Sequence, residues 1–240
     1  EAAVSEAERT VSVARALGQR TLVPRVLVWL GLLHFGRGDV ERGKQCVDEA
    51  WELSGAGNDT GGHLPAGDVH TIVPAHTGRA AYHLTMQEYE EAIRVGERGL
   101  AIADASGYVV WAIHRLLPVV AEAALWKSDM DRARRLASRM RRDSKRLGHA
   151  LGLAWADACE ALVELLKGDK HRSVDLLRNV AEQLEAVPYV PDAARVRRQL
   201  ARAPAETGDR EGATRELRRA HEVFAHLGAE PELIATRDQL

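Results

Sequence analysis

Apolar residues recur along this chain with the period of an amphipathic α-helix. In residues 130–147 they fall at steps of three, four and seven, which is typical of one helix face and not of strand alternation. This set comprises Ala133, Leu136, Ala137, Met140 and Leu147. No run of alternating β-branched residues occurs, so the pattern predicts an all-α protein with more than about 65% of its residues in helices.

Short polar turns separate the helical segments at a nearly constant interval. Asp129, Asp169 and Asp209 follow one another at about 40 residues, and Asp39 stands in an earlier turn of the same kind. A fixed period of this size indicates stacked helix pairs. The predicted first helices cover 22–36, 69–85, 108–127, 149–167 and 190–206. The predicted second helices cover 39–54, 88–105, 130–147, 170–186 and 210–227. Residues 1–17 are predicted to form a second helix without its partner.

A small residue follows each turn at the same distance. These residues are Gly43, Ala92, Ala133, Ser173 and Ala213. Small side chains let helix axes approach to roughly 8–9 Å, so we expect these positions to be buried at helix crossings. The acidic residue of each turn is expected to cap the second helix, and Gly18, Gly107, Gly148 and Gly228 are expected to end helices in the left-handed conformation.

The passage Tyr89-Glu90-Glu91-Ala92-Ile93 resembles the turn-to-helix segment of the tetratricopeptide repeat. Leu30-Gly31, His34, Gly38-Asp39, Gly43 and Ala50 resemble it as well. The later units depart from the family, because they run about 40 residues instead of about 34 and lack its terminal proline. They look like the degenerate long repeats at the C-terminal end of large bacterial ATPase-linked transcriptional regulators and nucleotide cyclases. The resemblance implies a right-handed α-solenoid of about five helix pairs plus an N-terminal half-repeat.

The chain is expected to be one domain, residues 1–240, of a longer multidomain protein, because it opens on Glu1-Ala2-Ala3 without an initiator methionine. One segment, residues 55–67, interrupts the repeats and is too rich in glycine to be helical. We predict a loop insertion there. A tolerated insertion and a mobile flap over the repeat surface both remain open for its role.

Composition excludes several classes of protein. A content of 45% hydrophobic residues and only two cysteines fits neither a disordered chain nor a disulfide scaffold. The net charge of −2 is far from the excess typical of nucleic-acid-binding domains, so direct nucleic-acid binding is not expected. The stretches 26–35 and 151–166 are too short and too polar to span a bilayer, so we expect no membrane partner and a cytoplasmic location. Cys46 and Cys159 lie far apart on separate predicted helices, which favours two reduced thiols over a disulfide.

No motif for catalysis, a cofactor or a metal is evident. The segment from Gly38 to Gln45 approaches a phosphate-binding loop, but Gln45 offers no hydroxyl for magnesium and a helix precedes the loop instead of a strand. His76 and His83 lie about 10 Å apart along one predicted helix and cannot share a zinc ion. A loop-assisted site with His63 and His70 is the alternative to ordinary polar histidines. We predict that the chain is not an enzyme and holds no metal or cofactor.

Arginines form a stripe along the predicted helix 130–147. They are Arg132, Arg135, Arg139, Arg142 and Arg146, with Arg134 and Arg141 beside them. Such a stripe could contact an anionic partner, but a solvated outer face is the favoured interpretation.

The exposed side of the first helices is the predicted partner-binding surface, because helical-repeat proteins bind partners on the face that these helices line. Its candidate residues are Arg25, Trp29, Leu32, Phe35, Thr77, Ala81, Arg115, Glu122, Trp126, Arg195, Arg198 and Arg202. The surface would therefore be aromatic early and basic late. Three cations on one face, Arg195, Arg198 and Arg202, would favour an acidic partner unless Asp192 and Glu206 neutralise them.

The predicted function is binding of a protein or peptide partner, or of other domains of the same polypeptide, in a bacterial signalling protein. The alternative is an effector sensor that holds a small molecule in the groove. An enclosed pocket containing Trp29 or Trp126 would favour the sensor.

Overall fold

The computed structural model describes residues 2–57, 68–186, 190–207 and 209–239, without the side chains of Lys170 and of residues 202–207. Helices make up 87% of the described residues, and no strand occurs among them. The prediction of an all-α protein is therefore confirmed. The predicted loop 55–67 lies largely outside the described residues.

The chain forms two compact units, Glu1–Lys127 and Ser128–Leu240, each of which is described by itself. Their boundary falls between the two helices of the third predicted pair. The assignment of residues 1–240 to one domain accordingly stays a prediction.

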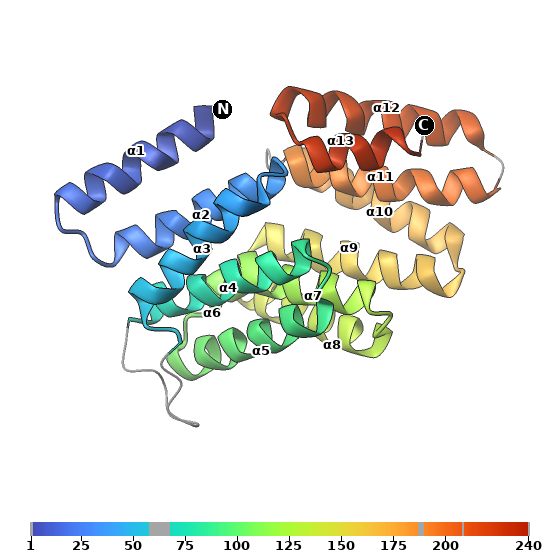
Figure 1. Ribbon diagram of the computed structural model, residues 1–240. Helices are drawn as coiled ribbons and strands as arrows, with labels where there is room; N and C mark the ends of the chain where they lie inside the picture. The colour runs from blue at the N-terminus through green and yellow to red at the C-terminus, as the bar shows by residue number, and fades with distance from the viewer. Residues whose placement is uncertain (1, 58–67, 187–189, 208, 240) are drawn as a thin grey trace. The chain divides into compact units, whose positions relative to one another are not determined.

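The first unit contains helices that pack as antiparallel neighbours (Figure 1). They are α1 (Ala2–Ala16), α2 (Leu22–Gly36), α3 (Val40–Ser54), α4 (Val69–Thr85), α5 (Tyr89–Ser106), α6 (Val109–Trp111), the π-helical segment η1 (Ala112–Leu116) and α7 (Leu117–Trp126). Helix α2 packs against α3 and α4 against α5, while α2 and α3 both contact α4. Core side chains such as Val28, Val47 and Ile93 fill the spaces between them.

Helices α6, η1 and α7 form one continuous helix, where we predicted a helix over 108–127. The amide of Leu117 donates to the carbonyl of Ala112, five residues back, and Pro118 follows at once. Proline has no amide hydrogen to continue the α-helical ladder, so the π-helical turn accommodates it. The extra residue in this turn rotates the side chains before it around the helix axis, relative to those that follow.

This helix, Val109–Trp126, has the length and apolarity of a membrane span, with a mean hydropathy of 1.4 over 18 residues. However, 56% of it is buried against the rest of the structure, and core helices pass the same test of length and composition. It is therefore weak evidence for a membrane span. It is also not one of the two stretches that the sequence marked as most apolar.

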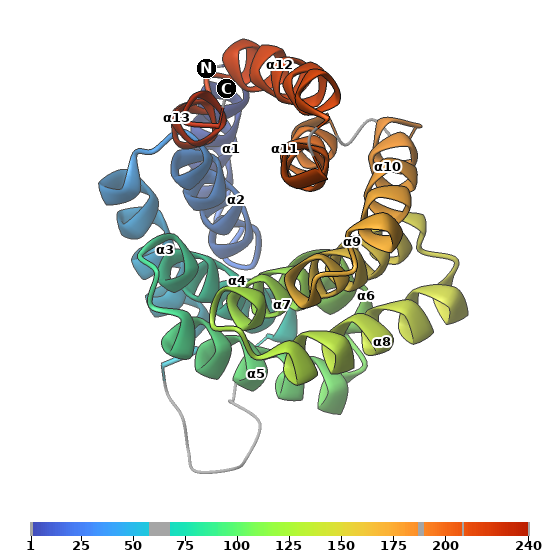
Figure 2. The same cartoon turned by 90° about the vertical axis from the view of Figure 1, so that its right-hand side faces the viewer.

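In the second unit each helix packs against the next (Figure 2). The helices are α8 (Met130–Leu147), α9 (Ala150–Lys167), α10 (Lys170–Ala186), α11 (Val190–Thr207), α12 (Arg210–Leu227) and α13 (Glu230–Arg237). Helix α13 was not predicted from the repeat pattern. It packs through Leu233 against Phe224 of α12.

The turn aspartates cap the helices as predicted. Asp39, Asp129, Asp169 and Asp209 each accept a hydrogen bond from the amide three residues later, at 2.8–3.2 Å. The glycines expected to end helices all have positive φ, for example 73° at Gly107 and 65° at Gly148. Local side-chain chemistry therefore determines where these helices begin and end.

The small residues after the turns are buried as predicted, and Ala133 and Ala213 are 0% and 5% exposed. Ala133 lies at the crossing of α8 and α9, where its carbonyl accepts a weak hydrogen bond from Cys159 Sγ at 3.5 Å. Ala133 is therefore enclosed between these two helices.

We expect Ala133→Leu to lower the free energy of unfolding by about 1–3 kcal/mol, because it overpacks this crossing. Arg135→Ala, an exposed position on the same helix, should change it by less than about 0.5 kcal/mol. Denaturant titrations of both variants measure the difference, and equal losses would contradict the assignment of the two faces.

Candidate functional site

Aromatic rings and guanidinium groups gather on one face of the first unit. They come from α2, from α4, from the helix 109–126 and from Tyr108, which directly precedes that helix. We name this set the aromatic–arginine cluster; it comprises Arg25, Trp29, Thr77, Tyr108, Trp111, His114 and Arg115. Four of these residues, Arg25, Trp29, Thr77 and Arg115, are among the candidates predicted for the partner-binding surface.

Two tryptophans form the centre of the cluster. The rings of Trp29 and Trp111 meet edge to face with centroids 5.6 Å apart, and Tyr108 stacks on Trp111 at 6.5 Å. The guanidinium of Arg115 lies over the Trp29 ring, 4.2 Å from its centroid. A cation at this distance from an aromatic face is attracted by the ring, which fixes the orientation of the guanidinium.

Thr77 lies beneath the cluster and not on the surface. It is fully buried; its Oγ1 accepts a hydrogen bond from Trp111 Nε1 at 3.0 Å and donates one to the carbonyl of Val73 at 3.1 Å. Ala81, one turn further along α4, is also buried and packs with Phe35. The expectation that Thr77 and Ala81 are exposed is wrong, because α2 and the helix 109–126 cover this side of α4; Thr77 positions Trp111 instead.

Arg25 is the second cation of the cluster. Its Nε is buried and has no hydrogen-bond partner among the described groups. Burial raises the pKa of the neighbouring Tyr108 hydroxyl, the Arg25 charge counteracts that rise, and Asp68 adds to it. The tyrosine is thus neutral at physiological pH and can donate a hydrogen bond.

Two more predicted residues of α2 belong to the core. Phe35 is 7% exposed and packs against Tyr82 with ring centroids 6.1 Å apart. Leu32 is partly buried against the same core. Placing Phe35 on the partner-binding face was wrong, because α3 and α4 both pack against its end of α2.

Glu122 and Trp126 are exposed, as predicted, but they lie away from the cluster. Trp126 is 54% exposed, donates from Nε1 to Glu122 at 3.4 Å and stacks on Tyr89. From Arg115 to Trp126 the helix rises by roughly 16 Å. These two residues therefore form a separate small patch.

The late arginines of the predicted surface are paired within the chain. Glu232 of α13 accepts a hydrogen bond from Arg195 at 2.6 Å and forms an ion pair with Arg198 at 2.7 Å, and Asp192 lies 3.8 Å from Arg195. Of the two alternatives left open by the sequence, neutralisation within the chain therefore holds for these two residues, and Glu232 of α13 is a partner that the sequence had not indicated. The side chain of Arg202 lies outside the described part.

Part of the arginine stripe of α8 is also paired within the chain, and part of it is exposed. Arg134 and Arg141 bind carboxylates of α9 at 2.6 Å, and Arg139 lies 3.6 Å from the buried Asp143 of its own helix. Arg135 and Arg146 are exposed, as expected of a solvated face. Arg139, in contrast, is half-buried and not on that face.

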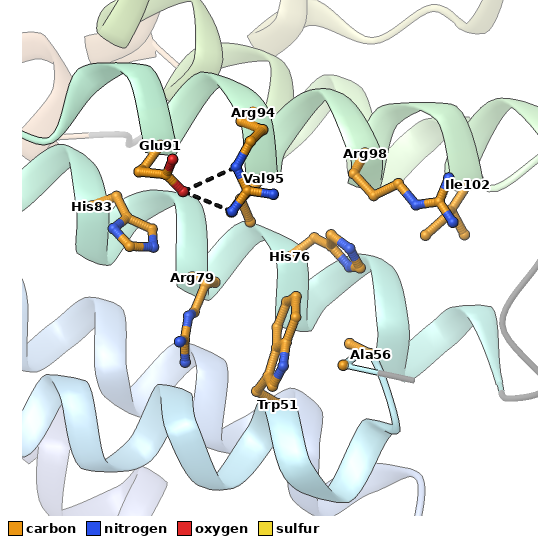
Figure 3. Close-up of a pocket in the computed structure, with 11 residues that line it drawn as sticks. Trp51, Ala56, His76, Arg79, His83, Glu91, Arg94, Val95, Arg98 and Ile102 are labelled. Carbon is orange, nitrogen blue, oxygen red and sulfur yellow. Dashed lines mark hydrogen bonds and ion pairs between the residues drawn. The ribbon is translucent and has the colours of Figure 1, made fainter. Parts of the chain in front are cut away.

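A pocket of about 300 Å³ lies elsewhere in the first unit, between α3, α4 and α5 (Figure 3). Trp51, Arg79 and Arg98 are among its lining residues, but neither Trp29 nor Trp126 is. This pocket is therefore not the enclosed site around Trp29 or Trp126 that would have favoured an effector sensor. The sequence pattern did not single out this pocket, although the helical spacing of its histidines and arginines is visible in the sequence.

Within the described residues no group of three or more histidine, cysteine, aspartate and glutamate side chains could hold a metal. His63 lies outside those residues, while His76 Nδ1 donates to the carbonyl of Ile72 at 2.9 Å. Both cysteines are free, and burial raises the pKa of Cys159 to about 12. A thiol with such a pKa is a poor nucleophile at neutral pH.

No family model matches the chain, and no curated protein matches it. Among solved structures, the crystal structure of BtubC (BKLC) from P. vanneervenii is similar, with a TM-score of 0.61 and 15% sequence identity. The similarity covers 93% of this chain and 90% of that one. At this identity it shows a shared helical fold only.

Proposed function

We propose that the chain is a tetratricopeptide-like α-solenoid whose aromatic–arginine cluster binds an acidic segment of a protein partner. The observation that carries this proposal is a pair of cations at half-buried aromatic rings: Arg115 lies over Trp29, and the charge of Arg25 acts on Tyr108. Tryptophan and arginine are the residue types that most often dominate the binding energy of an interface. The evenly spaced capped turns, buried small residues and antiparallel neighbouring helices support the solenoid.

The chemistry of the cluster suits a carboxylate flanked by an apolar side chain. Arg115 is held over the Trp29 ring, so little side-chain entropy is lost when it binds a partner. A guanidinium donates two parallel hydrogen bonds to one carboxylate, and such charge-assisted bonds are among the strongest in proteins. The rings of Trp29 and Tyr108 offer apolar area to the neighbouring residue of the partner.

In this proposal the chain is the cytoplasmic regulatory or interaction region of a bacterial signalling or transcriptional regulator, and not an enzyme. The partner is a separate protein or another domain of the same polypeptide. Binding more tightly to one state of that partner than to another would transmit a signal.

The test uses two fluorescent ten-residue peptide libraries, one with glutamate and one with lysine at alternate positions. We expect the chain to retain peptides from the acidic library only, with an affinity that falls as salt rises. Arg115→Glu should weaken binding at least about tenfold, since a hydrogen bond to a charged group contributes about 1.5–3 kcal/mol.

Arg135→Glu is the matched control, because it makes the same charge change on an exposed part of α8 and should leave binding unchanged. Equal retention of the two libraries, or wild-type affinity in the Arg115→Glu variant, would refute the proposal. Thermal melts of both variants check that the fold is retained.

A further inference from the structure

The pocket between α3, α4 and α5 has a chemistry that differs from that of the aromatic–arginine cluster. Helix α4 presents Thr77 to the cluster, whereas His76, Arg79 and His83 line the pocket. These three residues follow one another at i, i+3 and i+7 and therefore share one face of the helix. Figure 3 shows them directed into the space between α3 and α5.

Helix α5 supplies the opposite wall. Glu91, Arg94, Arg98 and Ile102 lie along one side of α5, and α4 and α5 are antiparallel neighbours. The two helices approach closely at Gly99, where a Cβ atom would lie 2.6 Å from the Cβ of His76. A side chain there would separate the helices, so this glycine shapes one end of the pocket.

The lining carries a surplus of cationic groups. It contains three guanidinium groups and two imidazoles but a single carboxylate, that of Glu91. Asp48, which binds Arg79 at 2.5 Å, and Glu88, which accepts from His83 at 2.6 Å, are not part of the lining. The carboxylates that bind Arg79 and His83 are thus not among the residues that line the pocket.

Arg79 is fixed in place before any ligand arrives. Its Nη1 donates to Asp48, and its guanidinium lies 5.4 Å from the centroid of the Trp51 ring. A guanidinium has five N–H donors in a planar fork, so this single hydrogen bond leaves it able to donate to a ligand. Trp51 adds an apolar wall beside it (Figure 3).

Arg94 is held more loosely. It donates from Nε and Nη2 to Glu91 at 3.0 and 2.7 Å, but the two side chains are 69% and 45% exposed. Ion pairs this exposed contribute little to stability, since solvent screens them. A ligand with a higher negative charge than one carboxylate can therefore take over this guanidinium.

We propose that this pocket binds a small phosphomonoester, with its phosphate among Arg79, Arg94 and Arg98 and its organic part against Trp51. A phosphate dianion has three terminal acceptor oxygens and can use guanidinium groups from two helices, whereas one carboxylate is saturated by a single fork. The volume of about 300 Å³ is at the lower end for small-molecule sites and too small for a folded partner.

The experiment is calorimetric titration of the chain with adenosine 5′-monophosphate, inorganic phosphate and adenosine. We expect the monophosphate to bind most tightly, phosphate more weakly, and adenosine without measurable heat at about 1 mM. Arg94→Gln and Arg98→Gln should each weaken binding of the monophosphate about tenfold. Both positions are at least partly exposed, so the variants should fold.

Arg9→Gln is the matched control. Arg9 forms an exposed i, i+3 ion pair with Glu6, like that of Arg94 with Glu91, but lies on α1 away from the pocket lining. The affinity of the Arg9→Gln variant for adenosine 5′-monophosphate should equal that of the wild type. No heat with either phosphate compound, equal binding of adenosine and its monophosphate, or unchanged affinity in Arg94→Gln and Arg98→Gln would each overturn the proposal.

Failure here is distinguishable from failure of the proposed partner binding. Arg115→Glu should weaken retention of acidic peptides and leave the titration with adenosine 5′-monophosphate unchanged, because Arg115 is not part of the pocket lining.

Discussion

Arg197→Ala is expected to lower the free energy of unfolding of the second unit by about 3–5 kcal/mol. Arg197 is 9% exposed and joins three helices: from α11 it donates to Glu185 of α10 at 2.8 Å and to Glu216 of α12 at 2.6 Å. Burial by itself lowers the pKa of Arg197, but the hydrogen bonds to the two carboxylates outweigh it and raise the pKa. Removing the cation leaves Glu216, whose side chain is 16% exposed, with only the longer 3.8 Å contact to Arg219.

Arg195→Ala is the control for this prediction, because Arg195 lies on the same helix but is 45% exposed in its ion pair with Glu232. Its loss should cost no more than about 1 kcal/mol. Denaturant titration followed by circular dichroism gives both values. A cost for Arg197→Ala as small as that for Arg195→Ala would show that the three-helix contact contributes little.

Gly43→Ala is expected to destabilise the first unit by about 2–3 kcal/mol. Gly43 and Gly31 face each other where α3 crosses α2: a Cβ on Gly43 would overlap the ring of Phe35 and lie 3.1 Å from the carbonyl oxygen of Gly31. The ring has little freedom to move, since Phe35 is buried against Tyr82. The steric cost should exceed the gain of up to about 1 kcal/mol in helix propensity.

Gly36→Ala provides the comparison. Gly36 is the last residue of α2, and a Cβ there would meet nothing within 4 Å. This variant should be neutral or more stable by up to about 1 kcal/mol. Thermal melts of the two alanine variants measure the difference, and a similar change in both would mean that the crossing can widen without cost.

The partner-binding surface was predictable only in part. Helical spacing and turn alignment selected Trp29 and Arg115 from two different helices, and the structure brings them together. The same alignment placed Phe35 and Thr77 on that face, where neighbouring helices bury them. Periodicity gives the direction of a side chain from its helix axis, but not which neighbour lies in that direction.

The sequence by itself determined the described helices that precede α13, together with their ends. The 3.6-residue periodicity, the turn aspartates and the glycines that end helices act within a few residues, so their effect does not depend on the rest of the fold. The burial of the small residues after the turns was also predictable, because close helix crossings require small side chains and these residues recur at a fixed distance from each turn.

Only the tertiary structure decided which charges remain available. Glu232 neutralises Arg195 and Arg198 from α13, and Arg197, which no pattern had singled out, holds three helices together. The cationic pocket likewise needs residues of α3, α4 and α5 at once. Electrostatic interactions depend on distances in space, and a carboxylate more than 30 residues away in sequence from its arginine becomes its partner only when the helices pack.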